Sequence, residues 1–266
     1  MTREPASRAK AHTSYYLGDG TKVPSVTSIL RVIGKGEHLL TWANSLGLDG
    51  YDVIEYRKAQ AAVGTLGHAM IQADLLGRSM DFYGFSQEER DRADNVLRSY
   101  RAWRRLHNPE PILVEEPLVS ESCKYGGTID LYARLGDLCG IIDVKTSNDI
   151  YDEHFYQIAA YSRLLVENGH RVDFNAILRV GRDEGDGFTF QMAKNPQRDL
   201  AVFDAAHALY LRMQERTAAA KNEIPVVRKR RSSTNTVALV VGAGTSVVKE
   251  AAGDVPAATP SEQEGR

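Results

Sequence analysis

The stretch Ile141-Ile142-Asp143-Val144-Lys145-Thr146 decides how the fold is interpreted. Successive side chains of a β-strand point to opposite faces, so Ile142 and Val144 share one face while Asp143 and Lys145 share the other. The apolar face is suited to pack against a helix, and the acid and the lysine are expected to point together into a cleft. On its own, an Asp-x-Lys pattern is common on strands, where most examples are surface ion pairs.

An upstream stretch, Gly126-Gly127-Thr128-Ile129-Asp130, repeats this alternation. Gly136-Asp137 lies between the two stretches and is a turn signal, so they are predicted to pair as a hairpin. Asp130 and Asp143 would then lie close together, with the apolar residues on either side of Asp130 facing the core. Two adjacent carboxylates repel each other, and a hard divalent cation such as Mg²⁺ or Mn²⁺ relieves the repulsion. A lysine beside that ion is placed to orient a water or to neutralise a developing phosphate charge.

The surrounding sequence predicts an α/β (α+β) fold with a mixed central β-sheet flanked by helices. Periodicity indicates helices at about 54–76, 86–108, 151–168 and 198–220, and strands at about 112–119, 125–134, 139–146, 172–180 and 187–192. Ser86 and Glu89 match a capping box at the start of the second helix. Gly64 and Gly67 lie inside the first helix, where each costs about 1 kcal/mol relative to alanine. We therefore expect another element to approach these glycines closely.

Composition excludes several classes of protein. Of the 266 residues, 42% are hydrophobic and 26% are charged, which is typical of a globular domain and not of a collagen or a coiled coil. No apolar run approaches the roughly 20 residues of a membrane span, and no secretory signal begins the chain, so a cytoplasmic protein with no membrane partner is expected. Neither GxGxxG nor GxxxxGK[ST] occurs in a nucleotide-binding context. The net charge of −2 excludes a histone-like binder but permits a local basic groove.

The predicted domain organisation has three parts. Residues 1–14 are expected to be flexible, 15–225 to form one domain, and 226–266 to be a basic and then disordered tail. The basic run is Arg228–Arg231, and Thr236–Val241 has the composition of a short strand.

Four segments, in this order, resemble the PD-(D/E)xK nuclease superfamily in its RecB-like exonuclease branch. They are Pro24–Leu30, the G-x-x-x-H pattern of Gly64–His68, the core formed by Gly126–Asp130 with Asp143–Thr146, and the Q-x-x-x-Y pattern of Gln157–Tyr161. The branch includes phage-encoded, CRISPR-adaptation and mitochondrial genome-maintenance exonucleases. The resemblance covers about residues 15–220 and implies a PD-(D/E)xK nuclease-like core.

The resemblance also implies roles for individual residues. Metal binding would fall to His68, Asp130, Asp143 and the backbone carbonyl of Val144, and catalysis to Lys145 with the two aspartates. Gln157, Tyr161 and Thr146 would contact DNA or support the lysine, and Glu116 is a further candidate because some relatives use an acid in that region. The implied cofactor is Mg²⁺ or Mn²⁺. An iron–sulfur cluster is not expected, because the two cysteines, Cys123 and Cys139, are fewer than the four that such branches use.

Other charged residues have two interpretations. Arg98, Arg101 and Arg105 share a helix face that is either solvated or grips phosphates, and the same alternatives hold for Arg228–Arg231. The histidines without matching partners are interpreted as structural, namely His107, His154, His170 and His207.

The expected function is a metal-dependent exonuclease acting at DNA ends, in recombination, replication, repair or phage genome processing. DNA is the expected partner, together with a recombination or replication protein, in a bacterial or phage-infected cell. Two alternatives stay open at this point: a structure-specific endonuclease or resolvase with the same metal site, and a non-catalytic DNA-binding module of the same fold.

Overall fold

The structure is a computed structural model that describes residues 4–5, 13–34 and 37–223. Contacts divide the chain into two compact units, and the fold described is that of the first unit, which ends at Lys221. The predicted tail 226–266, with Arg228–Arg231, lies outside the described residues, as does most of the predicted flexible segment 1–14. Within the described residues, no helix combines the length and the hydropathy needed to cross a membrane.

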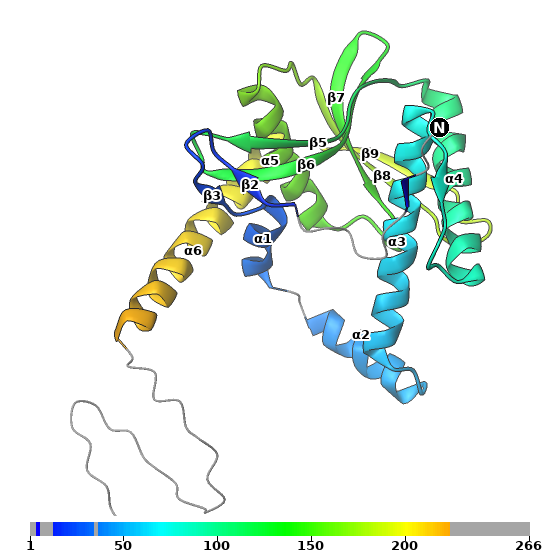
Figure 1. The fold of residues 1–266 in the computed structure, drawn as a ribbon, viewed down its shortest axis with the longest axis horizontal. Helices are drawn as coiled ribbons and strands as arrows, with labels where there is room; N and C mark the ends of the chain where they lie inside the picture. Colours follow the sequence, from blue (N-terminus) through cyan, green and yellow to red (C-terminus); the bar gives the residue numbers. More distant parts are fainter. Residues whose placement is uncertain (1–3, 6–12, 35–36, 224–266) are drawn as a thin grey trace, which may run out of the picture. The chain divides into compact units, whose positions relative to one another are not determined.

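A five-stranded mixed sheet forms the centre of the fold, as the sequence predicts (Figure 1). Its strands follow in spatial order as β5 (Glu110–Ser120), β6 (Tyr125–Leu135), β7 (Leu138–Lys145), β8 (Phe174–Val180) and β9 (Phe188–Met192). All neighbouring strands are antiparallel except β7 and β8, which run parallel. A parallel connection needs a crossover, and helix α5 (Asp152–Glu167) supplies it between these two strands.

Helices cover both faces of the sheet. On one face, α3 (Val53–Leu76) and α4 (Gln87–His107) pack against Ile142 and Val144 of β7 and against the alternating residues of β8. On the other face, α1 (Val26–Leu30), α5 and α6 (Pro196–Glu223) enclose a second core that includes Ile141. Strands buried on both sides are therefore nearly continuous runs of apolar residues, and a polar side chain among them must find a partner.

Local signals account for the ends of the long helices. The capping box predicted from Ser86 and Glu89 is present: the Glu89 amide donates to Ser86 Oγ over 3.2 Å and the Ser86 amide donates to Glu89 Oε2 over 2.7 Å. Asp52 caps the start of α3 by accepting from the amides of the first turn, and Gly77 ends it with a φ of 62°.

Several short elements were not predicted from the sequence. They are the strand pair β1 (Glu4–Pro5) with β4 (Met80–Asp81), the 3₁₀ turn η1 (Arg31–Ile33) and the helix α2 (Glu37–Leu48). These unpredicted elements are too short or too weakly periodic to be recognised without their tertiary contacts. A small hairpin of β2 (Tyr15–Tyr16) and β3 (Lys22–Val23) packs beside β5 and β6, and the turn signal Asp19-Gly20 between its strands does predict it from the sequence.

The glycines inside α3 confirm the prediction of a close approach. A Cβ on Gly64 would lie 2.9 Å from Thr146 Oγ1, and one on Gly67 would lie 2.7 Å from Val96 Cγ1. Helix α3 is thus held against the end of β7 and against α4 at a spacing that larger residues do not permit. This close packing places the residue after Gly67, His68, beside the sheet.

Candidate active site

The regular alternation of β6 is interrupted at Asp130. Ile129 and Leu131 are both fully buried, but Ile129 packs in the core beside α5 whereas Leu131 packs in the core beside α4. Residues two apart on a regular strand share a face, so the expectation that both face one core is wrong in this detail. Because helices cover both faces of the sheet, each face offers an apolar environment to the side chains of β6. The alternation of these side chains shifts by one residue at Asp130, so Ile129 and Leu131 point to opposite faces.

The neighbouring strand is irregular at the same level. Glu115 of β5 has a φ of 52°, and its strand neighbours Val114 and Glu116 pair with Leu131 and Ile129. An L-residue in this left-handed region costs about 1–2 kcal/mol, and such strain is concentrated at functional sites. The irregular backbone brings the Glu115 carboxylate toward the Asp130 carboxylate across the two strands.

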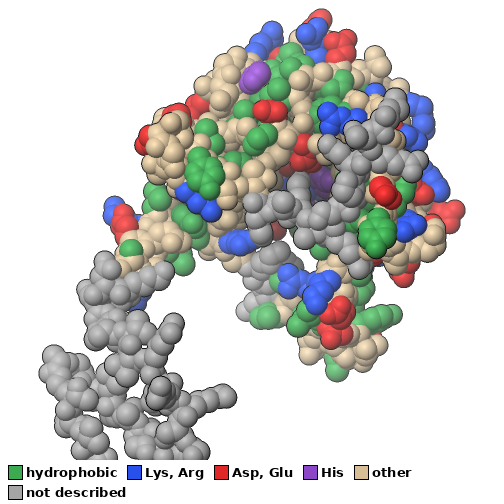
Figure 2. Space-filling model, viewed as in Figure 1, with side chains coloured by type: hydrophobic (Ala, Val, Ile, Leu, Met, Phe, Trp, Pro, Cys, Tyr) green, Lys and Arg blue, Asp and Glu red, His purple; other side chains and the backbone are tan. Residues whose placement is uncertain are grey.

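Three side chains converge at this point. His68 Nδ1 of α3 lies 3.8 Å from Asp130 Oδ2, and one ligand atom from each of His68, Glu115 and Asp130 lies within 4.8 Å of the other two. In Figure 2, acidic and histidine side chains lie next to each other in a hollow beside α3. All three residues are partly exposed, so solvent reaches the group. Two carboxylates and an imidazole with this spacing form a donor set that fits a divalent cation.

Asp130 also ties β6 to β7 where their ladder ends. The paired register of the two strands ends with Leu131 opposite Ile142, and beyond it the Val144 amide donates to Asp130 Oδ2 over 3.0 Å. The Asp130 side chain therefore replaces a backbone acceptor and is held in position by it. Val144 contributes its N–H to this bond, while its carbonyl as a metal ligand stays a prediction.

A second set of contacts is built on Lys145. Its ammonium lies 2.6 Å from Asp143 Oδ2 and donates to Gln157 Oε1 over 3.0 Å. The Asp143 side chain is only 1% exposed and that of Lys145 is 18% exposed, so the lysine neutralises a carboxylate that would otherwise be a buried charge. Asp143 thus contacts the lysine and does not belong to the group of His68, Glu115 and Asp130.

The Q-x-x-x-Y pair continues this set of contacts. Gln157 Nε2 donates to the Tyr161 hydroxyl over 2.9 Å, which orients the amide so that its oxygen faces Lys145. Burial raises the pKa of Tyr161 well above its usual value, and the charges of Asp143 and Asp130 raise it further, so the phenol stays neutral. A Cβ on Gly127 would lie 2.4 Å from Tyr161 Cε1, which explains why a glycine stands opposite the ring. Gln157, which Tyr161 contacts, is therefore in place beside the lysine, while a supporting or DNA-contacting role for the pair stays a prediction.

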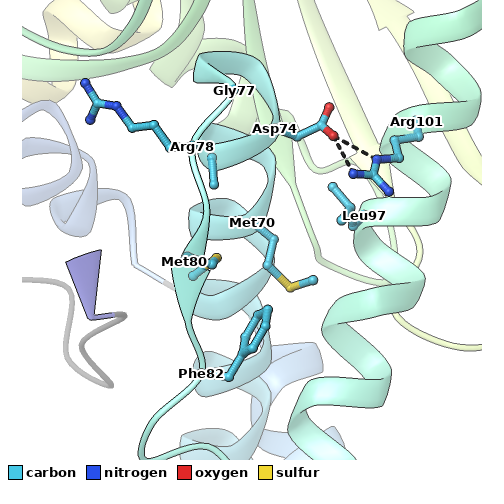
Figure 3. Close-up of a pocket in the computed structure, with 9 residues that line it drawn as sticks. Met70, Asp74, Gly77, Arg78, Met80, Phe82, Leu97 and Arg101 are labelled. Atoms are coloured by element: carbon cyan, nitrogen blue, oxygen red, sulfur yellow. Dashed lines mark hydrogen bonds and ion pairs between the residues drawn. The ribbon is translucent and has the colours of Figure 1, made fainter. Parts of the chain in front are cut away.

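The predicted basic face of α4 is engaged in contacts within the fold. Arg101 forms an ion pair with Asp74 over 2.6 Å, and Arg98 donates to Asn95 over 3.3 Å. Arg101 and Asp74 point toward one another at a pocket of about 440 Å³ that is otherwise lined largely by apolar side chains such as Met70 (Figure 3). Arg105 is exposed on the same helix. A role of Arg98, Arg101 and Arg105 in holding DNA stays a prediction.

Glu116 is exposed and outside the group of His68, Glu115 and Asp130, whereas its neighbour Glu115, which was not predicted, is part of this group. The sequence offered one signal for Glu115, namely that two acids, Glu115 and Glu116, stand next to each other. Strand alternation could not show which of the two faces Asp130, because it does not reveal a residue in the left-handed conformation. The histidines interpreted as structural each lie against an aromatic ring, in the pairs His107 with Trp103, His154 with Tyr151, His170 with Tyr132 and His207 with Phe203.

Comparisons with known proteins give limited similarity. No family model and no curated protein match the chain. The crystal structure of an alkaline exonuclease, LHK-Exo from Laribacter hongkongensis, is 11% identical over 57% of this chain and 84% of that chain, with a TM-score of 0.31. LHK-Exo in complex with dAMP is 11% identical over 74% of this chain and 94% of that chain, with a TM-score of 0.34. We therefore base the function on the residues of this chain.

Proposed function

We propose that the chain is a divalent-metal-dependent nuclease of the PD-(D/E)xK superfamily that hydrolyses DNA from its ends. One observation carries the proposal: His68, Glu115 and Asp130 converge from a helix and two strands to within 4.8 Å. Lys145 lies on the strand next to Asp130, joined to it through the Val144 amide. The motif residues that are far apart in the sequence are thus neighbours in the fold.

The donor set defines what this site would hold. His68, Glu115 and Asp130 would hold Mg²⁺ or Mn²⁺, with Asp143 as the further ligand that the family resemblance implies. A bound cation would stabilise negative charge on the phosphate oxygens. Without it, two partly buried carboxylates face each other beside an imidazole, an arrangement that like-charge repulsion opposes.

Lys145 would act directly on the substrate. An ammonium group has three N–H donors, and Asp143 and Gln157 accept two of them. The third is oriented by these two bonds and would donate to a water or to a phosphate oxygen. Its positive charge would then stabilise the charge that develops as the phosphodiester bond is hydrolysed.

DNA is the proposed substrate, and ends are the proposed place of attack. The RecB-like motif order supports an exonuclease over the alternatives of a resolvase or a non-catalytic binding module. Recombination, replication, repair and phage genome processing are the proposed settings, because each of them requires digestion of DNA from ends.

Digestion of end-labelled single- and double-stranded DNA with Mg²⁺, Mn²⁺ or EDTA tests this proposal. Asp130→Asn and Lys145→Gln are expected to lose at least about 100-fold in rate while still binding DNA, because removal of one charge-stabilising donor typically costs that much. Asp137→Asn is the matched control, since Asp137 is an exposed acid in the turn of the same β6–β7 hairpin. Its activity should equal that of the parent.

The outcomes separate the alternatives. Digestion of linear DNA but not of closed circles supports an exonuclease, and digestion of both supports the endonuclease. Cutting by Lys145→Gln at the parent rate would refute the assignment of this site. Unfolding curves of each variant check that loss of the Lys145 charge beside buried Asp143 has not unfolded the protein.

A further inference from the structure

Three aromatic rings form an exposed patch at the end of α3 that is remote from the sheet. Trp42 of α2 lies 6.1 Å from Tyr56 of α3, and Tyr51, in the connection between these helices, lies 6.0 Å from the same ring. Trp42 is 36% exposed and Tyr51 is 58% exposed. We call these three residues the aromatic patch. Soluble proteins bury rings of this size where they can, so a cluster left at the surface indicates a binding surface.

The aromatic patch is connected to the candidate active site by a basic residue. Arg182, in the loop between β8 and β9, interacts electrostatically with Tyr56 and donates to Asn148 Oδ1 over 2.6 Å. Asn148 lies three residues after Lys145. Burial lowers the pKa of Arg182 and the neighbouring Arg92 lowers it further, whereas Asp183 raises it. Arg92 is paired with Asp183 over 3.0 Å, while the hydrogen-bond partner of Arg182, Asn148, is uncharged. Arg182 is therefore a partly buried cation with a neutral hydrogen-bond partner.

Helix α3 sets the distance between the two places. Tyr56 precedes His68 by twelve residues on this uninterrupted helix, which corresponds to about 18 Å along the axis. At about 3.4 Å per stacked nucleotide, this is the length of roughly five nucleotides of one strand. One strand could therefore contact the aromatic patch while its end lies at His68, Glu115 and Asp130.

We propose that the aromatic patch stacks on the bases of single-stranded DNA whose end is at the site of His68, Glu115 and Asp130, with Arg182 on its backbone. This inference rests on the proposed function and adds the substrate form. Exposed rings next to a cation are the combination that binds single strands without sequence preference. Duplex DNA does not offer its base faces for stacking. Figure 2 shows hydrophobic, basic and acidic side chains beside each other over α2 and the adjoining end of α3.

The competing occupant is a protein partner, because aliphatic side chains are exposed on the same segment. Leu48 at the end of α2 and Ile54 at the start of α3 are both largely solvent-accessible. A protein interface would depend on these aliphatic groups as much as on the rings. Single-stranded DNA would depend on the rings and not on these aliphatic groups, so Leu48→Ala is a matched control for Trp42→Ala.

Tryptophan fluorescence tests the proposal directly. The chain has two tryptophans, and Trp103 is fully buried, so quenching by DNA reports on Trp42. The full chain is titrated in EDTA with an oligothymidylate of about twelve nucleotides, which exceeds the roughly five-nucleotide spacing. We expect quenching in the parent and in Leu48→Ala, and a Kd raised about 5- to 100-fold in Trp42→Ala, measured by anisotropy of labelled DNA.

The outcomes are distinct from those of the nuclease assay. An unchanged Kd for the long oligonucleotide in Trp42→Ala would overturn this inference, even if the parent digests DNA. An equal loss of affinity in Leu48→Ala and Trp42→Ala would also overturn it, in favour of a general apolar surface. Quenching by DNA in a parent that never cuts would support the inference while refuting the nuclease.

Discussion

Replacing Glu115 by glycine is expected to make the protein more stable and less active. The φ of 52° costs an L-residue about 1–2 kcal/mol, and glycine adopts this conformation without that cost. Glycine also raises the entropy of the unfolded chain, which costs about 0.5–1 kcal/mol, so the net gain in unfolding free energy lies between about 0 and 1.5 kcal/mol, with a midpoint of about 0.75 kcal/mol. For a domain of this size the melting temperature should rise by roughly 1.5–3 °C at that midpoint.

Metal should reverse this order of stability. In EDTA, Glu115→Gly is expected to unfold at a higher urea concentration than the parent. With Mn²⁺ at about 100 times its Kd, the parent gains about 2.7 kcal/mol by ligand binding, whereas the variant has lost one of three donors and gains less. Nuclease activity with the same ion should fall by at least about tenfold, which is the loss expected for about 1.4 kcal/mol of weakened binding.

Glu116→Gly is the matched control for this prediction. Glu116 is the next residue of β5, is exposed and has no left-handed backbone, so glycine should only weaken the strand, by about 0.5–1 kcal/mol. Its response to Mn²⁺ should equal that of the parent. If Glu115→Gly were destabilised in EDTA as much as Glu116→Gly, both the strain and the proximity to Asp130 would be refuted as explanations.

Two further predictions concern packing and pH. Gly67→Ala should lower the unfolding free energy by roughly 1 kcal/mol, since its Cβ would meet Val96 Cγ1 at 2.7 Å, and Val96→Ala should relieve most of this loss. Gly47→Ala, in α2 with open space around it, should instead stabilise by up to about 1 kcal/mol, and equal effects at both glycines in urea unfolding would contradict the packing. Burial raises the pKa of Tyr100 to about 12 and also raises that of Tyr125. In the unfolded chain the two phenols lose their protons at about pH 10, whereas in the folded chain they keep them to higher pH. The free energy of unfolding should therefore be constant below this pH and should fall as the pH rises above it. Tyr125→Phe should reduce the fall, and a flat urea midpoint through this range would count against the burial effect.

Local sequence signals account for most of the secondary structure. The period of two in β6 and β7, the capping box of α4 and the turn at Gly136 act over a few residues, so each can be recognised without knowing the rest of the chain. The glycines of α3 predicted a close contact, because their cost within a helix had to be offset. The order of the motifs, which resembles that of one nuclease branch, predicted that His68 would lie near Asp130 and Gln157 near Lys145, but it did not predict Glu115.

Long-range contacts determined the detail of the candidate site. The change of sides at Asp130 and the left-handed Glu115 arise from the pairing of β5 with β6 between helices on both faces, which neither strand specifies alone. The contact of Asp143 with Lys145 follows from burial of the carboxylate, which requires the nearest cation as its partner. The aromatic patch exists because α2 packs on α3, although α2 has too little periodicity to be predicted. The sequence determines the chemistry of each side chain, but which side chains become its neighbours depends on the packing free energy of the whole folded chain.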